Sequence, residues 1–178
     1  GLMHVAVARA LGVRVVASDF LADRRARALA LGAEVAVEPE HAAAELRVRF
    51  GEGPAVVVCG PGSAAALAHA LESVWPDGTV VMFTPLEPGE RVPFDQSSAY
   101  FRDLRLVASY SCGPEETHAA RAWIETGIVT AERLGARHYP LEAAPEAYRA
   151  MRAGEIVKAI VSSAPFVREA PATARKRG

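Results

Sequence analysis

The chain has 178 residues, of which 51% are apolar and 23% are charged, and its formal net charge is −1. This length suits one domain of ordinary size, and the composition excludes intrinsic disorder, collagen and coiled coil. A net charge near zero provides no basic field for a phosphate backbone or an anionic bilayer, so we expect neither nucleic acid nor a membrane as a partner. No apolar run reaches the roughly 18 residues that a membrane span requires.

The cysteine content bounds the redox compartment and the metal chemistry. Cys59 and Cys112 are the two cysteines of the chain, too few for a disulfide scaffold. No Cys or His pair stands at the spacing of zinc ligands. The sequence therefore predicts a cytoplasmic protein with no metal site on this chain.

Hydrophobic periodicity predicts that strands and helices alternate along most of the chain. The predicted helices cover residues 2–11, 23–31, 41–50, 63–75, 97–103 and 114–126. The predicted strands cover residues 13–18, 34–37, 55–59, 79–83 and 105–109. Asp23 is expected to cap the second helix. The run from Ala55 to Cys59 is apolar at every position, which is typical of a strand buried on both faces.

This alternation predicts an α/β fold of the Rossmann type, a doubly wound parallel sheet with helices on both faces and right-handed crossovers. The pattern changes after residue 136, where a helix over 144–153 and a strand over 156–162 are expected. We therefore expect a Rossmann-type domain over residues 1–136, a closing segment over 137–163 and a flexible tail over 164–178.

In a doubly wound sheet the ligand binds at the carboxyl ends of the strands, so the candidate site residues are those that directly follow a strand. Asp19 follows the strand predicted over 13–18. A carboxylate there can accept both hydroxyls of an adenosine ribose and repel a 2′-phosphate, and Arg24 can fold back over the same ribose. The alternative makes Asp19 the cap of the next helix and Arg24 a solvated surface charge.

Other candidates are weaker. The segment Gly60-Pro61-Gly62 fits the close approach of a ligand and a tight strand-to-helix turn equally well. Cys59 ends a buried strand and is interpreted as a packed, inert thiol. The sequence contains no Gly-x-Ser-x-Gly elbow and no Walker loop, so its residues alone indicate no group that breaks bonds.

Several short motifs, in their order along the chain, resemble the zinc-type medium-chain dehydrogenases, and most closely the sorbitol and threonine dehydrogenase branch. They extend over about residues 1–163 and comprise Gly1-Leu2-Met3-His4, the runs Ala8 to Asp19, Arg24 to Ala33 and Pro76 to Val81, Ala108-Ser109-Tyr110-Ser111, and the closing runs Tyr139 to Glu142 and Glu155 to Lys158. The resemblance implies that this chain is the NAD-binding, C-terminal half of such an enzyme.

The resemblance also implies residue roles at the adenosine end of the cofactor. Gly1 matches the third glycine of the family's Gly-x-Gly-x-x-Gly turn, so the first strand of the sheet is expected to be missing from this chain. Asp19 takes the adenosine ribose, which favours NAD over NADP, and Arg24 is the second residue that contacts it. The missing strand would leave two strand edges facing a gap, so we expect the isolated chain to be poorly stable unless another chain fills that gap.

Five further residues receive implied roles in the same way. Val58 and Cys59 would line the adenine and ribose side of the crevice, and Phe83 and Thr84 would present backbone to the nicotinamide amide. Lys158 resembles the basic residue that reaches the cofactor pyrophosphate, and a surface lysine at a strand start is an equal alternative. Thr84 departs from the family, which usually has a glycine there to let the backbone approach the nicotinamide ring.

The activity that the resemblance implies is oxidation of a small-molecule alcohol or polyol by hydride transfer to NAD. Catalytic zinc and its ligands belong to an N-terminal domain that no stretch of this chain matches, so this chain alone is expected to be inactive and residues 137–163 to pack on that domain. The strand from Arg105 to Ser109 is expected to pair with its twofold mate in a homodimer or homotetramer. The alternatives are a zinc-independent NADPH quinone or enoyl reductase of the same superfamily, a truncated non-catalytic nucleotide-binding fragment, and a methyltransferase, whose fold has no place for the closing run.

Overall fold

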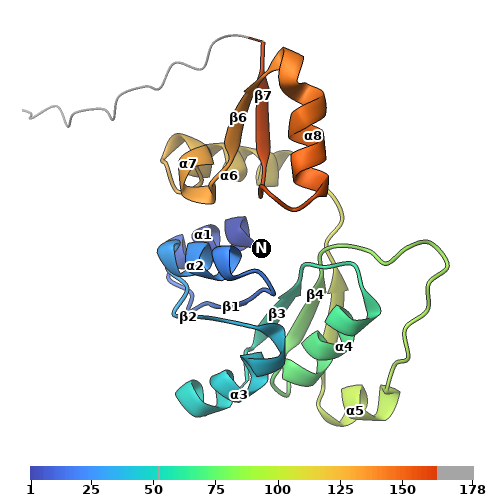
Figure 1. Ribbon diagram of the computed structural model, residues 1–178. Helices are drawn as coiled ribbons and strands as arrows, with labels where there is room; N and C mark the ends of the chain where they lie inside the picture. Colours follow the sequence, from blue (N-terminus) through green and yellow to red (C-terminus); the bar gives the residue numbers. More distant parts are fainter. Residues whose placement is uncertain (52, 164–178) are drawn as a thin grey trace, which may run out of the picture. The chain divides into compact units, whose positions relative to one another are not determined.

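The computed structural model describes residues 1–51 and 53–163, which form two compact units (Figure 1). The first unit runs from Gly1 to Ile128, and the second begins at Val129. The predicted tail over 164–178 lies outside the described residues. Within the described part of the chain, no helix combines the length and the apolar character that crossing a membrane would require.

The first unit contains six helices and five strands among its described residues. Its helices are α1 (Leu2–Ala10), α2 (Ala22–Ala30), α3 (Pro39–Phe50), α4 (Ala64–Ser73), α5 (Gln96–Phe101) and α6 (Pro114–Glu125). Its strands are β1 (Val16–Ser18), β2 (Val35–Val37), β3 (Val56–Cys59), β4 (Thr79–Met82) and β5 (Arg105–Ala108). Strands and helices alternate as the periodicity predicts.

The strands of the first unit form two parallel pieces, a two-stranded piece β1–β2 and a three-stranded piece β3–β4–β5. Helices α1 and α2 lie on one side of the two-stranded piece and α3 on the other (Figure 1). The predicted class, a Rossmann-type α/β fold with parallel strands, is confirmed. Among the described residues, β1 pairs only with β2 and β3 only with β4, so these two strands each keep one unpaired edge. In the strand order 3-2-1-4-5-6 of doubly wound sheets, the first strand lies between such a pair.

The three-stranded piece carries a dry apolar cluster against α4. Its centre is Val74 and Val80, which are 1% and 0% exposed. Val57 of β3 packs on this cluster, whereas its neighbours Val56 and Val58 are 55% and 42% exposed. The prediction that residues 55–59 are buried on both faces is therefore wrong. Side chains alternate along a strand, and only the face of β3 toward α4 is covered.

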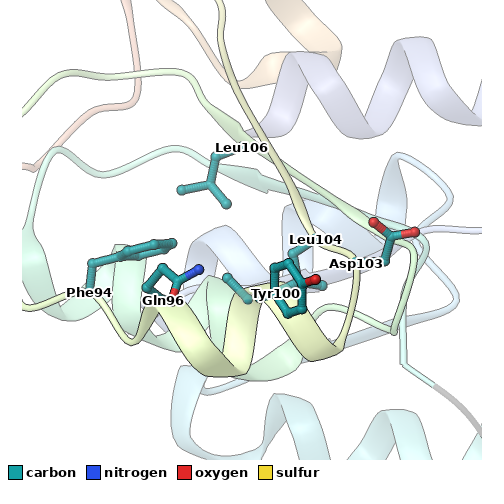
Figure 2. Close-up of a pocket in the computed structure, with 7 residues that line it drawn as sticks. Phe94, Gln96, Tyr100, Asp103, Leu104 and Leu106 are labelled. Carbon is teal, nitrogen blue, oxygen red and sulfur yellow. The ribbon is translucent and has the colours of Figure 1, made fainter.

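The far edge of the same piece borders a hollow of about 680 Å³, which lies between α5 and β5. Figure 2 shows its labelled lining side chains, which are Phe94, Gln96, Tyr100, Asp103, Leu104 and Leu106. Within the described residues, β5 pairs with β4 on one side and leaves its other edge unpaired.

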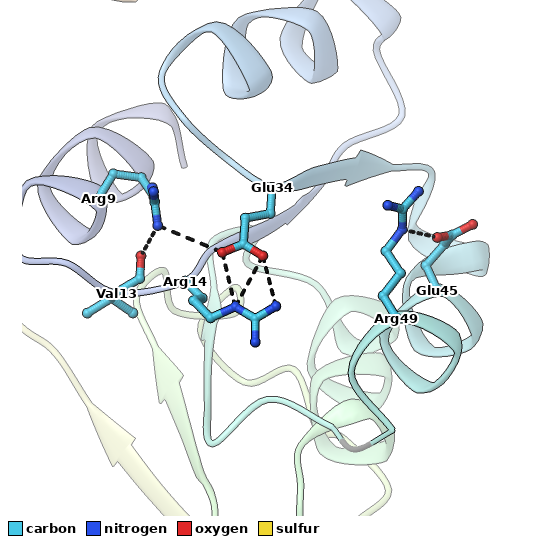
Figure 3. A network of polar contacts seen from close by, with 6 residues as sticks. All are labelled: Arg9, Val13, Arg14, Glu34, Glu45 and Arg49. Carbon is cyan, nitrogen blue, oxygen red and sulfur yellow. Dashed lines mark hydrogen bonds and ion pairs between the residues drawn. The ribbon is translucent and has the colours of Figure 1, made fainter.

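Charged side chains add to the apolar packing of the two-stranded piece, where Val35 of β2 and Ala28 of α2 are 6% and 2% exposed. Glu34, just before β2, accepts hydrogen bonds from Arg14 Nε at 3.0 and 3.1 Å and from Arg14 Nη2 at 3.0 Å (Figure 3). Arg9 of α1 donates to the carbonyl of Val13 at 2.9 Å and lies 3.9 Å from the Glu34 carboxylate. The Arg14 guanidinium also stacks 4.2 Å from the ring centre of Phe50, at the end of α3. These contacts connect four segments to one another, which are α1, the residues that precede β1, the start of β2 and the end of α3.

Two predicted element boundaries in this region are corrected. Strand β1 begins at Val16 rather than at Val13, because the amide of Val13 donates to Ala8 and completes the last turn of α1. Helix α2 begins after Leu21, and Asp23 lies inside its first turn, so Asp23 is not the cap of that helix.

The second unit is a small βαβ arrangement. It comprises α7 (Ala131–Leu134), β6 (Arg137–Pro140), the 3₁₀ turn η1 (Leu141–Ala143), α8 (Ala144–Arg152) and β7 (Ala159–Ser162). Strands β6 and β7 are parallel, and α8 buries Ala147 and Ala150. The short elements α7 and β6 were not predicted, and β7 begins three residues later than the predicted strand over 156–162.

Candidate functional site

Asp19 directly follows β1, and the local backbone holds its carboxylate in place. Its amide donates to the carbonyl of Val37 at 3.1 Å, which extends the β1–β2 ladder by one residue. Its Oδ1 accepts a hydrogen bond from the amide of Leu21 at 2.9 Å, and its Oδ2 lies 3.7 Å from Arg24 Nη1. The side chain is one-third exposed, at 33%. The carboxylate is therefore oriented by the protein and still open to a ligand.

This geometry bears on both interpretations of Asp19. The bond from Leu21 is a local turn contact to the residue that precedes α2, as the capping interpretation requires. A carboxylate offers about four acceptor positions, and this bond occupies one of them. The remaining positions leave room for the two hydroxyls of a ribose.

Gly1 lies close to this carboxylate. Burial lowers the pKa of the Gly1 amino group, the Asp19 carboxylate raises it, and Arg24 lowers it. Gly1 precedes the first turn of α1, and the charges of Asp19 and Arg24 reach it. The structure thus brings Gly1, expected in the glycine turn over the pyrophosphate, near Asp19 and Arg24, expected at the adenosine ribose, beside a helix N-terminus of the kind that favours anions.

The other residues expected along the crevice lie at the ends of two strands. Val58 and Cys59, expected on the adenine and ribose side, end β3, and Phe83 and Thr84, expected at the nicotinamide, follow β4. Cys59 is 6% exposed, whereas Val58 and Phe83 are 42% and 47% exposed and Thr84 is exposed. The amide of Phe83 donates to the carbonyl of Cys59 at 3.1 Å, so the two strand ends stay in register. Side chains that remain this open can meet a ligand at the carboxyl edge of the sheet.

Gly62 explains how the segments after β3 and β4 approach each other. A Cβ atom on Gly62 would collide with the carbonyl oxygen of Pro85 and would come within 3.1 Å of the Thr84 methyl group. Glycine is therefore needed here for chain packing, which favours the tight-turn interpretation of Gly60-Pro61-Gly62. The same contact holds Thr84, the residue that departs from the family pattern, against the turn after β3.

His4 in the first turn of α1 was not predicted as a site residue. Its ring meets the ring of Phe83 edge to face, with 4.5 Å between their centres, and burial lowers the pKa of His4. This contact ties α1 to the end of β4, so it connects the ribose residues to the nicotinamide residues. No spacing rule in the sequence relates positions 4 and 83, so the sequence alone does not indicate this contact.

Comparison with known proteins identifies the relatives of this chain. Residues 1–126 match the family described as zinc-binding dehydrogenase. The chain belongs to this family. No curated protein matches it at the threshold applied.

Solved structures of similar proteins agree with this assignment. The alcohol dehydrogenase TADH from Thermus sp. ATN1 is 29% identical with a TM-score of 0.81, over 92% of this chain and 48% of that one. A zinc-binding dehydrogenase from Sinorhizobium meliloti 1021 bound to NADP is 27% identical with a TM-score of 0.78, over 90% and 48%. A structure from E. coli CFT073 named as a short chain alcohol dehydrogenase, in complex with NADH, is 17% identical with a TM-score of 0.74, over 88% and 47%. The chain spans about half the length of these proteins and corresponds to the C-terminal, cofactor-binding half of a medium-chain dehydrogenase.

The described residues of this chain do not assemble the ligand set typical of zinc. The group of three potential ligands that they bring within reach of one ion is Glu38, Glu40 and His41, and the last two are exposed. Zinc sites in proteins are built mainly from Cys and His. Burial raises the pKa of the Cys59 thiol, which lies 3.6 Å from the carbonyl of Pro61, so Cys59 is a packed thiol rather than a reactive one.

Lys158 belongs to the second unit. It is exposed and directly precedes β7, and its carbonyl accepts a hydrogen bond from the amide of Arg137 at 3.0 Å. Its ammonium group is therefore available to an anionic ligand, and its role at the pyrophosphate stays a prediction.

Arg25 and Glu38 are two further residues near Asp19 that the sequence did not single out. Arg25 donates to the backbone that follows Asp19 and forms an ion pair with Glu38 at 3.1 Å. An arginine beside another arginine on a polar helix carries no signal in the sequence, because its partners are fixed only by the path of the loop.

Proposed function

We propose that this chain is the cofactor-binding half of an NAD-dependent dehydrogenase that oxidises an alcohol or a polyol. The observation that carries the proposal is the Asp19 carboxylate, which is fixed at the end of β1, is partly exposed and has Arg24 beside it. When bound, the nicotinamide accepts the hydride that leaves the alcohol carbon. The zinc ligands and most substrate contacts belong, in this proposal, to a further domain, against which residues 137–163 pack.

Asp19 supplies the choice between the two dinucleotides. Its free acceptor positions bind the 2′- and 3′-hydroxyls of the adenosine ribose, and its negative charge opposes the 2′-phosphate of NADP. Arg24 lies over the same ribose and restrains the carboxylate through their 3.7 Å contact. The first turn of α1, beginning at Gly1, faces the pyrophosphate with its unpaired amides.

The rest of the crevice is assigned to the end of β3, on the adenine and ribose side, and to the residues after β4, at the nicotinamide. Val58 provides exposed apolar surface and Cys59 a buried floor on the adenine and ribose side, and the backbone of Phe83 and Thr84 faces the carboxamide. Lys158 neutralises charge on the pyrophosphate. The relatives include one protein bound to NADP and one bound to NADH, so the preference for NAD rests on Asp19.

Replacing Asp19 tests this proposal. Asp19→Ala in the full-length protein should weaken NAD binding roughly 10- to 100-fold, because it removes hydrogen bonds to a charged acceptor worth ~1.5–3 kcal/mol. Asp19→Asn keeps one acceptor oxygen and removes the charge, so it should lose discrimination against NADP with a smaller loss of NAD affinity. Titration of both cofactors by quenching of protein fluorescence measures the two effects.

Asp23→Ala is the matched control for these variants. Asp23 is an exposed carboxylate four residues further along, in the first turn of α2, and its removal changes the net charge in the same way. Asp23→Ala should leave both affinities within about twofold of the parent. Unchanged affinities in the Asp19 variants would remove Asp19 from the site, and tighter binding of NADP than NAD by the parent would favour the NADPH reductase alternative.

We also propose that the free edge of β5 pairs with a second copy of the chain. Val107 on this strand is 41% exposed, and the aromatic side chains of Tyr100, Phe101 and Tyr110 around it are 72%, 84% and 96% exposed. An unpaired strand edge with apolar neighbours is a template for pairing with another strand. The hollow beside it, lined by Phe94 and Leu106, gives side chains of the second copy a place to pack.

The oligomeric state tests the pairing. Val107→Lys places a charge on the edge strand and should shift a dimer or tetramer toward a smaller species in light scattering at a fixed concentration. Val48→Lys is the control, because Val48 lies on α3 and is already 84% exposed. A parent protein that is monomeric at every concentration, or a Val107→Lys variant with the parent's mass, would contradict this proposal.

A further inference from the structure

Arg25 sits at the point where the loop after Asp19 turns into α2. Its Nη1 donates to the carbonyl of Asp19 at 2.9 Å and to the carbonyl of Phe20 at 2.8 Å. Its Nη2 forms an ion pair with Glu38 Oε1 at 3.1 Å, directly after β2. The Arg25 side chain is 21% exposed, against 37% for Arg24, which has one contact to Asp19. Arg25 therefore faces the protein, whereas Arg24 faces the ligand side.

The peptide unit between Phe20 and Leu21 links Arg25 to the Asp19 carboxylate. Its carbonyl accepts from Arg25 Nη1, and its N–H donates to Asp19 Oδ1 at 2.9 Å. A peptide unit is planar, so an arginine that fixes the carbonyl also fixes the direction of the N–H. A hydrogen bond to the carbonyl also polarises the unit and strengthens its N–H as a donor. The orientation of the carboxylate thus depends on Arg25, which does not touch it.

Glu38 holds the guanidinium in the position that this arrangement needs. It is the residue that precedes α3, and its backbone follows the last residue of β2. Arginine can span two carbonyls and a carboxylate because its five donors have a fixed planar geometry, which the single ammonium group of lysine lacks. The loop after β1 is therefore tied to the end of β2 by one side chain.

We propose that Arg25, held by Glu38, is a positioning residue that sets the Asp19 carboxylate for the ribose diol and so contributes to cofactor selection. The proposal rests on the proposed function, because it assumes that Asp19 binds the adenosine ribose. It extends that function by assigning residues that act on the diol contact without meeting the cofactor.

The test compares ADP with 2′-deoxy-ADP, which differ by the hydroxyl that Asp19 would accept. In the full-length protein, the parent should bind ADP about tenfold more tightly than 2′-deoxy-ADP, the size of one hydrogen bond to a charged group. Arg25→Lys keeps the charge but cannot span the same acceptors, so this preference should fall to about twofold. The affinity for 2′-deoxy-ADP should change little, an outcome that general damage to the fold would not produce.

Three further variants complete the experiment. Glu38→Gln should lower the preference for ADP less than Arg25→Lys does, and the double variant should lower it no further than Arg25→Lys alone. Arg27→Lys is the matched control on the same helix, because no hydrogen bond or ion pair of its guanidinium is found within the described residues, and it should keep the parent's preference. If Arg25→Lys does not fold, Glu38→Gln carries the test.

The outcomes separate this inference from the proposed function. A parent protein that binds ADP and 2′-deoxy-ADP equally would overturn the assignment of Asp19 and this inference with it. A parent with the expected preference, retained in both Arg25→Lys and Glu38→Gln, would overturn the positioning role alone. Loss of affinity for both nucleotides by the same factor in a folded Arg25→Lys protein would also overturn it, because that result indicates a structural effect without specificity for the diol.

Discussion

The two pieces of the parallel sheet in the first unit both bury apolar side chains, and the two-stranded piece carries in addition the charged contacts nearest to Asp19. The three-stranded piece buries Val74 and Val80 to 1% and 0% exposure between β4 and α4. The two-stranded piece, whose strands have three residues each, is bordered by the hydrogen bonds of Arg14 to Glu34 and the contacts of Arg25. Val35, Ala28 and Leu31 are buried at the two-stranded piece as well, so its charged contacts add to apolar packing and lie beside the residues proposed for the ribose.

This difference indicates which changes in side-chain volume, pH or salt should affect the stability of each piece of the sheet. Burial of apolar side chains depends on volume and is nearly independent of pH and salt near neutrality. Charged hydrogen bonds depend on direction, on protonation and on ionic strength. Cofactor selection would thus be adjusted at the two-stranded piece by small angular changes in its charged contacts, while the buried apolar side chains of both pieces keep the unit folded.

The largest effect should come from the centre of the apolar cluster. Val80→Ala removes two methyl groups from a fully buried site, and lost transfer energy plus the cavity should cost about 2–3 kcal/mol of unfolding free energy. Val58→Ala on the neighbouring strand is the matched control, because Val58 is 42% exposed and should cost less than ~1 kcal/mol. Urea unfolding followed by far-UV circular dichroism measures both.

Either of two results would contradict the expected difference in stability loss between Val80→Ala and Val58→Ala. Equal losses of stability would indicate that the face of β3 with Val56 and Val58 is covered in solution. A cost of Val80→Ala that varied strongly between pH 5 and pH 8 would contradict the view that this piece is held by apolar packing.

The sequence was sufficient for the parts of the fold that depend on local pattern. The alternation of strands and helices follows from periodicity, and Asp19 was placed at a strand end because a polar residue closes an apolar run. The burial of residues 55–59 could not be predicted, because an apolar run shows what a strand tolerates and not which neighbours cover it. Val56 and Val57 look alike in the sequence and differ in burial because α4 covers one face of β3.

The site residues show the same limit. Asp19 and Arg24 could be selected by their distance from a strand end, whereas Arg25 acts through two carbonyls and a glutamate thirteen positions away in the chain. His4 and Phe83 meet across 79 positions. Residue type favours Asp23 as a helix cap, but the turn after β1 starts the helix one residue before it, so Asp23 falls within the helix. Contacts of this kind depend on the path of the loop, which residue types do not determine.

The smallest predicted effect concerns the charged contacts of the two-stranded piece. The hydrogen bonds from Arg14 hold the pKa of Glu34 below its ordinary value of 4.5. A carboxylate whose pKa is lower in the folded state stabilises the fold above its unfolded pKa, and this contribution is lost as the pH falls through the folded value. The stability of the parent relative to Glu34→Gln should therefore be greatest near neutral pH and should shrink below about pH 4.5.

Two controls isolate the ion pair. When Arg14→Gln is already present, the stability difference caused by Glu34→Gln should depend much less on pH. Added salt should also reduce this difference in the protein with Arg14, because the pair is exposed. Urea unfolding between pH 3 and pH 7 measures the difference in unfolding free energy between the parent and Glu34→Gln. If this difference grew as the pH fell, the ion pair of Glu34 would not stabilise the two-stranded piece.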